Sequence, residues 1–390
     1  MEKLAMRIKM RTSETIYIGC YILFIATCYI FQEIFYKPRA IWLFCPIIAI
    51  GVILSIVLNN QCTKKEMILR ISIILIFGIA AIVDSNAKML VYAALLCGAD
   101  MTSFRRIIKC SYWTSLIIVV CTMLLSFVGV LPNIGGRERN GVVIWTFGFG
   151  YYSGLPYAFF YLVLEHLYLK KKKAVWPELI VILGLNYIIY KLSTLRLTYY
   201  LIYLVIALYI VLIKFNWFNL KKKFLHYLTI LVYPITFIVS IWVNHAFTFD
   251  NPKLAAINKM LSDRLNLGHQ AMTLYKIKLF GNKIETYNNG PSEYFYVDCG
   301  FLYSLLGYGL IFTGLVLVFY VFLHNYSART NNKILFIWLT AVAAFSFSNN
   351  TWISIQYNPI LLLFPIVLKE YRRKKALFGN AKSEFDIALC

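Results

Sequence analysis

The sequence predicts an all-α polytopic membrane protein with about twelve transmembrane helices. Hydrophobic residues make up 60% of the 390 residues, and charged residues only 14%. Apolar runs recur along the chain at about the twenty-residue length that an α-helix needs to cross a hydrocarbon core ~30 Å thick. Short basic clusters separate these runs, so the net charge of +22 is expected to orient the chain in a lipid bilayer and not to bind nucleic acid.

Each expected span is placed on an apolar run between polar or basic flanks. The first run is expected to be a retained helix, because no small-residue cleavage site follows it. The 390 residues would then form a single integral membrane domain. The expected spans cover residues 15–36, 40–58, 67–83, 88–103, 111–131, 151–169, 174–192, 197–215, 224–243, 300–323, 333–349 and 356–368.

The distribution of lysine and arginine predicts which side of the membrane each connector faces. With the N-terminus in the cytoplasm, 26 of the 39 basic residues fall in inside segments and 13 in outside segments. Basic residues accumulate on the cytoplasmic side of membrane proteins, so both termini are expected to be cytoplasmic. Two longer segments would then face outward, a medium loop over residues 132–150 and a large loop over residues 244–299.

The large outward loop shows the spacing of amphipathic helices. Apolar residues follow mostly three-and-four spacing from Leu254 to Leu279, with a break near Leu267-Gly268. This pattern predicts one or two helices on the outer face of the membrane. They would either close over a cavity between the spans or rest in the interface.

The cysteines and histidines indicate neither a disulfide framework nor a metal site. None of the nine cysteines forms a CxxC pair, and only His245 and His269 fall outside, 24 positions apart. This spacing is not that of a metal site. The chain also has no P-loop and no dinucleotide-binding fingerprint. We therefore expect no metal and no cofactor.

Arginine is the main chemical group that the outward segments offer. Arg137, Arg139, Arg196 and Arg264 all fall in these segments. A planar guanidinium pairs with phosphate oxygens through parallel N–H groups, so several arginines at the outer surface would suit a pyrophosphate. Each arginine has a structural alternative, either contact with a lipid headgroup or an ion pair such as Arg264 with Asp263.

Two ionisable residues are candidates for catalysis. Asp298 lies where the large loop re-enters the membrane, and a carboxylate near hydrocarbon is costly unless it is used or paired. Its alternative role is to cap the following helix. His269 lies within the predicted amphipathic region, where its alternative role is to stabilise the interface.

Several short motifs occur in order along the chain. They are Gly136-Arg137-Glu138-Arg139, Phe147-Gly148-Phe149-Gly150, Leu192-Ser193-Thr194-Leu195-Arg196, Leu261-Ser262-Asp263-Arg264-Leu265, Leu279-Phe280-Gly281 and Tyr294-Phe295-Tyr296-Val297-Asp298. With these motifs and the expected topology, the whole chain resembles the Wzy-type O-antigen and capsular polysaccharide polymerases, and more distantly the O-antigen ligases.

The match to the family's motifs is incomplete. The family's pattern of an arginine followed after ten residues by a glycine matches from Arg137 to Gly148 and from Arg139 to Gly150. In the large loop, Arg264 instead lies 17 positions before Gly281. The Ser-Arg element is also interrupted, because two residues separate Ser193 from Arg196.

The resemblance implies a GT-C-like glycosyltransferase in the bacterial inner (cytoplasmic) membrane. It would transfer the growing glycan from an undecaprenyl-pyrophosphate-linked donor to an undecaprenyl-pyrophosphate-linked acceptor on the outer face, releasing undecaprenyl pyrophosphate. A flippase and a chain-length regulator would be its protein partners. The roles that follow are pyrophosphate binding for the four outward arginines, proton acceptance for Asp298 or His269, and loop structure for Gly148, Gly150 and Gly281.

Two other functions remain as alternatives. An O-antigen ligase would transfer a finished glycan to a different acceptor, and the sequence separates it poorly from a polymerase. A lipid-linked oligosaccharide flippase would be expected to carry charges within its spans and to show two related halves. Here the charges that face outward gather in the loops and not within the spans, and the halves do not repeat.

Overall fold

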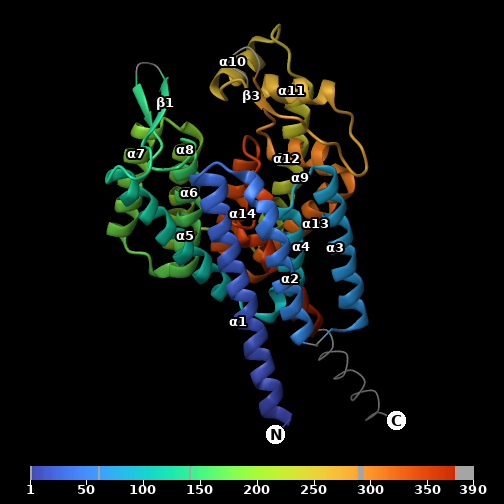
Figure 1. Cartoon of the computed structure of the whole chain (residues 1–390). Helices are drawn as coiled ribbons and strands as arrows, with labels where there is room; N and C mark the ends of the chain where they lie inside the picture. The colour runs from blue at the N-terminus through green and yellow to red at the C-terminus, as the bar shows by residue number, and fades with distance from the viewer. Residues whose placement is uncertain (1, 60–61, 140–141, 289–293, 374–390) are drawn as a thin grey trace.

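The protein is a bundle of α-helices with small loop elements at one end (Figure 1). The computed structural model describes residues 2–59, 62–139, 142–288 and 294–373. The N-terminus lies at the end of the bundle opposite the β1 hairpin and helices α10 and α11 (Figure 1). We call the end that carries β1, α10 and α11 the loop end, and the opposite end the basic end.

Seven helical segments among the described residues are long and apolar enough to cross a membrane. This confirms an all-α polytopic membrane protein at the level of helix length and composition, and each segment coincides with an expected span. They are Arg11–Ile34 (from α1, Glu2–Cys28, and η1, Tyr29–Ile34), Ile41–Asn59 (α2), Lys64–Val83 (α3), Phe104–Phe127 (α5), Arg196–Lys214 (α8, Arg196–Tyr209, and η5, Ile210–Lys214), Lys223–His245 (α9) and Gly300–Thr330 (α12, Gly300–Tyr303, η6, Ser304–Tyr308, and α13, Gly309–Thr330).

The other expected spans correspond to helices that do not meet the same criteria. Helix α4 (Lys88–Gly98) has 11 residues, and nine of them are buried, which is typical of a helix enclosed by its neighbours. The remaining helices of this kind are α6 (Gly154–Lys170), α7 (Trp176–Ser193) and α14 (Lys333–Ser346). The expected number of twelve transmembrane helices therefore stays a prediction.

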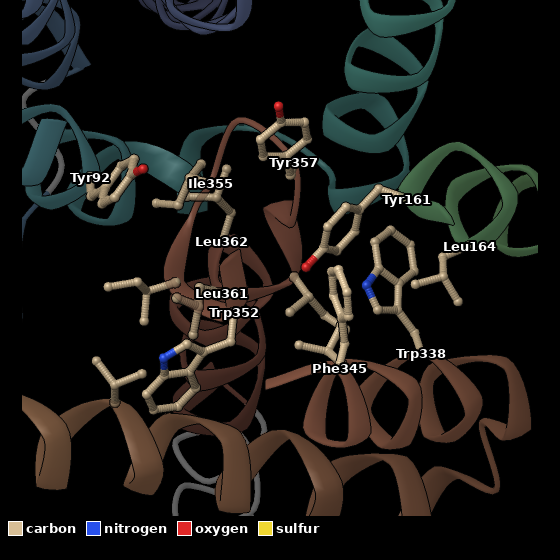
Figure 2. Close-up of a cluster of buried hydrophobic side chains, with 14 of the residues drawn as sticks. Tyr92, Tyr161, Leu164, Trp338, Phe345, Trp352, Ile355, Tyr357, Leu361 and Leu362 are labelled. Atoms are coloured by element: carbon tan, nitrogen blue, oxygen red, sulfur yellow. The ribbon is translucent and has the colours of Figure 1, made fainter. Parts of the chain in front are cut away.

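The last expected span differs from a continuous helix. After α14 the chain follows an irregular path over residues 347–362, with short 3₁₀ turns η7 (Thr351–Ile353) and η8 (Pro359–Leu362). An α-helix resumes only over residues 363–373. Nearly all side chains of the irregular segment are buried. Figure 2 shows this segment between the surrounding helices, with Trp352, Ile355 and Leu361 at the centre of the hydrophobic core.

Polar side chains bind the backbone of this irregular segment. The Asn358 amide nitrogen donates to the Trp352 carbonyl over 2.7 Å, and its oxygen accepts from the Trp338 indole over 3.0 Å. Tyr320 also donates to the Trp352 carbonyl over 2.5 Å. Inside an apolar bundle, non-helical backbone is tolerated only where its polar groups find such partners.

The two expected outward segments lie at the loop end and form small helices and strands. In the medium loop, β1 (Ile134–Arg139) pairs antiparallel with β2 (Val142–Trp145), and Arg139 lies opposite Val142. In the large loop, α10 (Pro252–Met260) and α11 (Arg264–Leu274) precede the strand pair β3 (Tyr287–Asn288) and β4 (Tyr294–Phe295). The two loops lie at the same end of the bundle (Figure 1), as the expected topology requires.

The large loop contains two helices, but they are separated at a different point from the expected one. Helix α10 ends at Met260, and Ser262 and Asp263 adopt left-handed conformations with φ of 56° and 69°. The Asn258 side chain stabilises this turn, since its oxygen accepts from the Leu265 backbone over 3.0 Å and its nitrogen donates to Asp263 over 2.7 Å. The expected break at Leu267-Gly268 instead lies inside α11, where a Gly268 Cβ would overlap Asn244 of α9.

Three predicted glycines lie where the loops closely approach the bundle. Gly148 and Gly281 have φ of +86° and +83°, a region that favours glycine. A Cβ on Gly281 would lie only 2.0 Å from the Gly307 carbonyl oxygen, so the backbone of the large loop approaches η6 closely. The Gly150 amide donates to the Glu33 carbonyl over 2.6 Å and joins the medium loop to η1.

Ion pairs gather at the basic end. Asp100 binds Arg70 over 3.1 Å and Lys369 over 3.2 Å, which joins the helix at residues 363–373 to α3 and to the turn after α4. Arg372 lies 3.9 Å from Glu66 of α3. These side chains line a shallow pocket at the surface. Because the cations and carboxylates there already face one another, we interpret the cluster as an anchor for the C-terminal helix.

We predict that Asn358→Ala destabilises the protein by about 2–4 kcal/mol. The substitution leaves the Trp338 indole and the Tyr320 hydroxyl without a bond to residue 358, in surroundings that exclude water. Thermal or denaturant unfolding of the purified protein in detergent would measure the loss. The exposed Lys259→Ala is the control, with an expected change below about 0.5 kcal/mol; equal stabilities for both variants would contradict the role of Asn358.

We predict that Gly281→Ala lowers the free energy of unfolding by at least about 2 kcal/mol. Alanine is strained at positive φ, and its Cβ would overlap backbone that cannot rotate away. The matched control is Gly314→Ala, because a Cβ at Gly314 meets nothing within 4 Å. The same unfolding measurement checks both variants, and a Gly281→Ala protein as stable as its control would refute the close approach.

Candidate functional site

The structure brings together two predicted site residues, Arg264 and Asp298. Arg264 is the first residue of α11, and its Nε lies 3.3 Å from Oδ2 of Asp298, which precedes α12. Both side chains are largely buried, with 17% and 18% of their surfaces exposed. The pair therefore joins the large loop to the start of the Gly300–Thr330 span.

A second contact fixes the same guanidinium. Nη1 of Arg264 donates to the Ser348 carbonyl over 2.6 Å and to the Ser348 hydroxyl over 2.8 Å. Ser348 lies just beyond the C-terminal end of α14, where the helix dipole and unpaired carbonyls favour a cation. The alternative of an Arg264–Asp263 ion pair is not the arrangement observed, because Asp263 binds Asn258 and Asn266.

Hydroxyl and amide groups surround the ion pair. Tyr157 of α6 and Tyr152 lie close enough to interact with the Arg264 charge, and Tyr157 is within hydrogen-bonding reach of it. Tyr296 interacts electrostatically with Asp298 and accepts a hydrogen bond of 3.2 Å from the Asn350 side chain. The site thus combines a cation, a carboxylate and neutral groups of the kind that bind sugar hydroxyls.

Burial and charge change the proton affinities of the pair. Burial raises the pKa of Asp298 above its usual range, and the neighbouring guanidinium opposes this rise. For Arg264, burial is the largest single influence and acts to lower the pKa, but Asp298, Tyr157 and Tyr152 together outweigh it, so the pKa lies above its usual value. Asp298 is therefore a stronger base than an exposed aspartate, while Arg264 keeps its charge.

His269 has a different set of contacts. Its Nδ1 lies 3.2 Å from both the Asn244 and His245 carbonyl oxygens at the end of α9. Positions five apart on an α-helix project about 140° apart, so the His269 ring leaves α11 on another side from Arg264. The observed contacts join α11 to α9, and a catalytic role for His269 remains a hypothesis.

The other predicted arginines lie elsewhere at the loop end. Arg196 is exposed at the start of α8, whereas Arg137 and Arg139 lie on β1, with side chains outside what the structure describes. Figure 1 shows β1, α7 and α8 on one side of the bundle and α10 and α11 on the other. The structure therefore does not bring Arg196 to the Arg264–Asp298 pair.

Sequence reasoning missed several residues around the pair, notably Tyr157, Ser348 and Asn350, and it named Tyr296 only as part of a motif. One signal was present, because the polar run Ser348-Asn349-Asn350-Thr351 interrupts two apolar stretches. Polar residues at membrane depth are often functional. No comparable signal marks Tyr157 within an aromatic-rich helix.

Within the part of the chain that the structure describes, no group of three or more His, Cys, Asp and Glu side chains could hold a metal ion. Comparison of the chain with models of protein families, with curated proteins and with solved structures found no match. The interpretation of the site therefore depends on the chemistry of its own residues.

Proposed function

We propose that the protein is a polysaccharide polymerase that joins undecaprenyl-pyrophosphate-linked oligosaccharide repeat units. The observation that carries this proposal is the contact between Arg264 and Asp298 over 3.3 Å. These residues come from two separate motifs on which the resemblance to Wzy-type polymerases rests. Helices that could cross a membrane, and two loops at one end of the bundle, also support it.

The chemistry of such a transfer needs positive charge more than an acid. An acceptor sugar hydroxyl attacks the anomeric carbon of the donor, the bond from that carbon to the pyrophosphate oxygen breaks, and the hydroxyl loses its proton. Pyrophosphate is already a good leaving group, so a fixed cation that binds it supplies the main stabilisation. Arg264 is suited to this role because its guanidinium is always charged and is held in place by Ser348.

Asp298 would act as the base through an exchange of partners. Without substrate, it is the counterion of Arg264. A donor pyrophosphate that binds the guanidinium would replace Asp298 as the counterion of Arg264. The Asp298 carboxylate would then stay buried, with a weaker positive charge beside it. Such a carboxylate binds protons more strongly. Donor binding would thereby prepare Asp298 to accept the hydroxyl proton of the acceptor sugar.

The proposal also assigns sides to the molecule. The loop end, with α10, α11 and the β1 hairpin, would face the outer side of the bacterial inner membrane, where lipid-linked repeat units are available. The basic end would face the cytoplasm together with both termini, in agreement with the bias of basic residues. The two loops would then reach the pyrophosphate headgroups at the outer surface.

We predict that a strain lacking the protein accumulates single lipid-linked repeat units on the outer face of the membrane. An Arg264→Ala gene should not restore chain growth, because the variant has no cation for the pyrophosphate. The control is Lys259→Ala, which removes an exposed cation from the same loop and should restore growth. Glycolipid profiles and a test of the side that the glycan faces measure the outcome.

Two results would contradict this prediction. Repeat units that face the cytoplasm would favour a flippase. Full-length glycan from an Arg264→Ala strain with normal protein levels would refute the role of the guanidinium.

We predict that polymerisation slows as the pH falls through the raised pKa of Asp298. The active form is the carboxylate, which is present above this pKa and is lost below it. Initial rates of the purified protein with the accumulated glycolipid would show this acidic limb. Asp298→Glu should retain an acidic limb, whereas Asp298→Asn should lose about 10²–10⁴-fold in rate. If an active Asp298→Asn protein showed the same loss of rate at low pH as the wild type, the base would be another residue.

A further inference from the structure

A second polar cluster lies at the loop end, where α3 ends and α4 begins. Asp84 is the residue that follows α3, and the Tyr303 hydroxyl donates to its two carboxylate oxygens over 2.9 and 3.0 Å. Lys88 is the first residue of α4, and its Nζ donates to the Gln32 side chain over 2.8 Å. All four side chains are partly buried, so they remain accessible from the surface.

Helix stability does not explain these charges. A carboxylate at the C-terminal end of α3 and an ammonium at the N-terminal end of α4 each meet the unfavourable end of a helix dipole. Partial burial adds a desolvation cost to both. The bonds of Asp84 with Tyr303 and of Lys88 with Gln32 join neighbouring helices and offset part of this cost. Residues that contradict local preferences tend to mark functional sites.

The cluster is connected to the Arg264–Asp298 pair through two tyrosines. Tyr303, which binds Asp84, lies near Tyr296. Tyr296 in turn lies near Asp298. Asp84 and the large loop also meet at Gly307, where an added Cβ would lie 3.6 Å from Asp84 Oδ1 and 3.4 Å from Ile284. Polar groups therefore extend from the ion pair to Asp84 along the start of the Gly300–Thr330 span.

The charge balance of the cluster favours hydroxyl groups over phosphate. The charge of Lys88 acts on the carboxylates of both Asp84 and Glu33, so cations do not predominate. Burial raises the pKa of Asp84 to about 6, opposed mainly by its bond from Tyr303, so the carboxylate form prevails at neutral pH. A carboxylate that accepts hydrogen bonds, beside an ammonium and an amide that donate them, matches the mixed character of sugar hydroxyls.

We propose that Asp84, Lys88, Gln32 and Tyr303 form a glycan subsite that binds sugar hydroxyl groups beside the Arg264–Asp298 pair. This inference rests on the proposed function. The pyrophosphate would bind at Arg264, and the sugars would extend along Tyr296 and Tyr303 to Asp84 and Lys88. Neither Asp84 nor Lys88 belongs to the motifs of the sequence analysis, so the subsite adds a separate determinant of substrate recognition.

The test uses the oligosaccharide that mild acid releases from the glycolipid of the deletion strain. This probe lacks pyrophosphate, so its binding to the purified full-length protein in detergent reports contacts with the sugars. Asp84→Asn and Lys88→Gln are each expected to weaken binding by about tenfold or more, as expected for losing charged hydrogen bonds. The matched control Asp250→Asn alters an exposed carboxyl of the large loop and should bind as the wild type does.

Unchanged affinity of a folded Asp84→Asn or Lys88→Gln protein would overturn the subsite and leave the polymerase proposal intact. So would wild-type binding of the intact glycolipid without binding of the released oligosaccharide. A wild-type protein that binds neither probe would instead overturn the proposed function, and the subsite with it. A monodisperse elution profile and a near-wild-type unfolding midpoint identify folded variants. If Asp84→Asn does not fold, the binding of Lys88→Gln alone tests the subsite.

Discussion

The structure depends on hydrogen bonds to the backbone of the irregular segment 347–362, which lies inside an apolar bundle. Water is not available there, so the polar groups of this segment need partners from the protein itself. Asn358 and Tyr320 provide them at the Trp352 carbonyl. Because the segment is held in this way, its first residues present a carbonyl and an amide to the loop end. Arg264 binds that carbonyl at Ser348, and Tyr296 receives the amide of Asn350.

The surroundings of the Arg264–Asp298 pair satisfy both of its charges. A buried cation is tolerated where a counterion and hydrogen-bond acceptors satisfy it, and Asp298 and Ser348 supply both. In the proposed mechanism, a phosphate would replace the carboxylate while Ser348 stays bound, so the guanidinium would not have to move when its partner changes. In the same proposal, the sugars would extend along Tyr296 and Tyr303, two neutral groups that lead away from the charged site. This is why we assign the pyrophosphate to the charged pair and the sugar hydroxyls to the second polar cluster.

Apolar runs predicted the helical membrane architecture well, because hydrophobicity and length are local properties of a sequence. They did not predict the irregular path over residues 347–362, since an apolar run looks the same whether it forms a helix or packs as buried turns. The break between α10 and α11 was misplaced because it depends on side-chain bonds of Asn258. Arg264 and Asp298 were separate candidates, and only the tertiary fold pairs them. The sequence did not single out Asp84 and Lys88, because the short polar segment that contains them looks like an ordinary connector between two apolar runs.

The most direct test of this account is an experimental structure of the protein with the glycolipid from the deletion strain bound. The account predicts that the pyrophosphate contacts Arg264, that Asp298 has separated from the guanidinium, and that the sugars lie along Tyr296 and Tyr303 toward Asp84. A pyrophosphate bound at Arg196, with the Arg264–Asp298 pair intact, would contradict it.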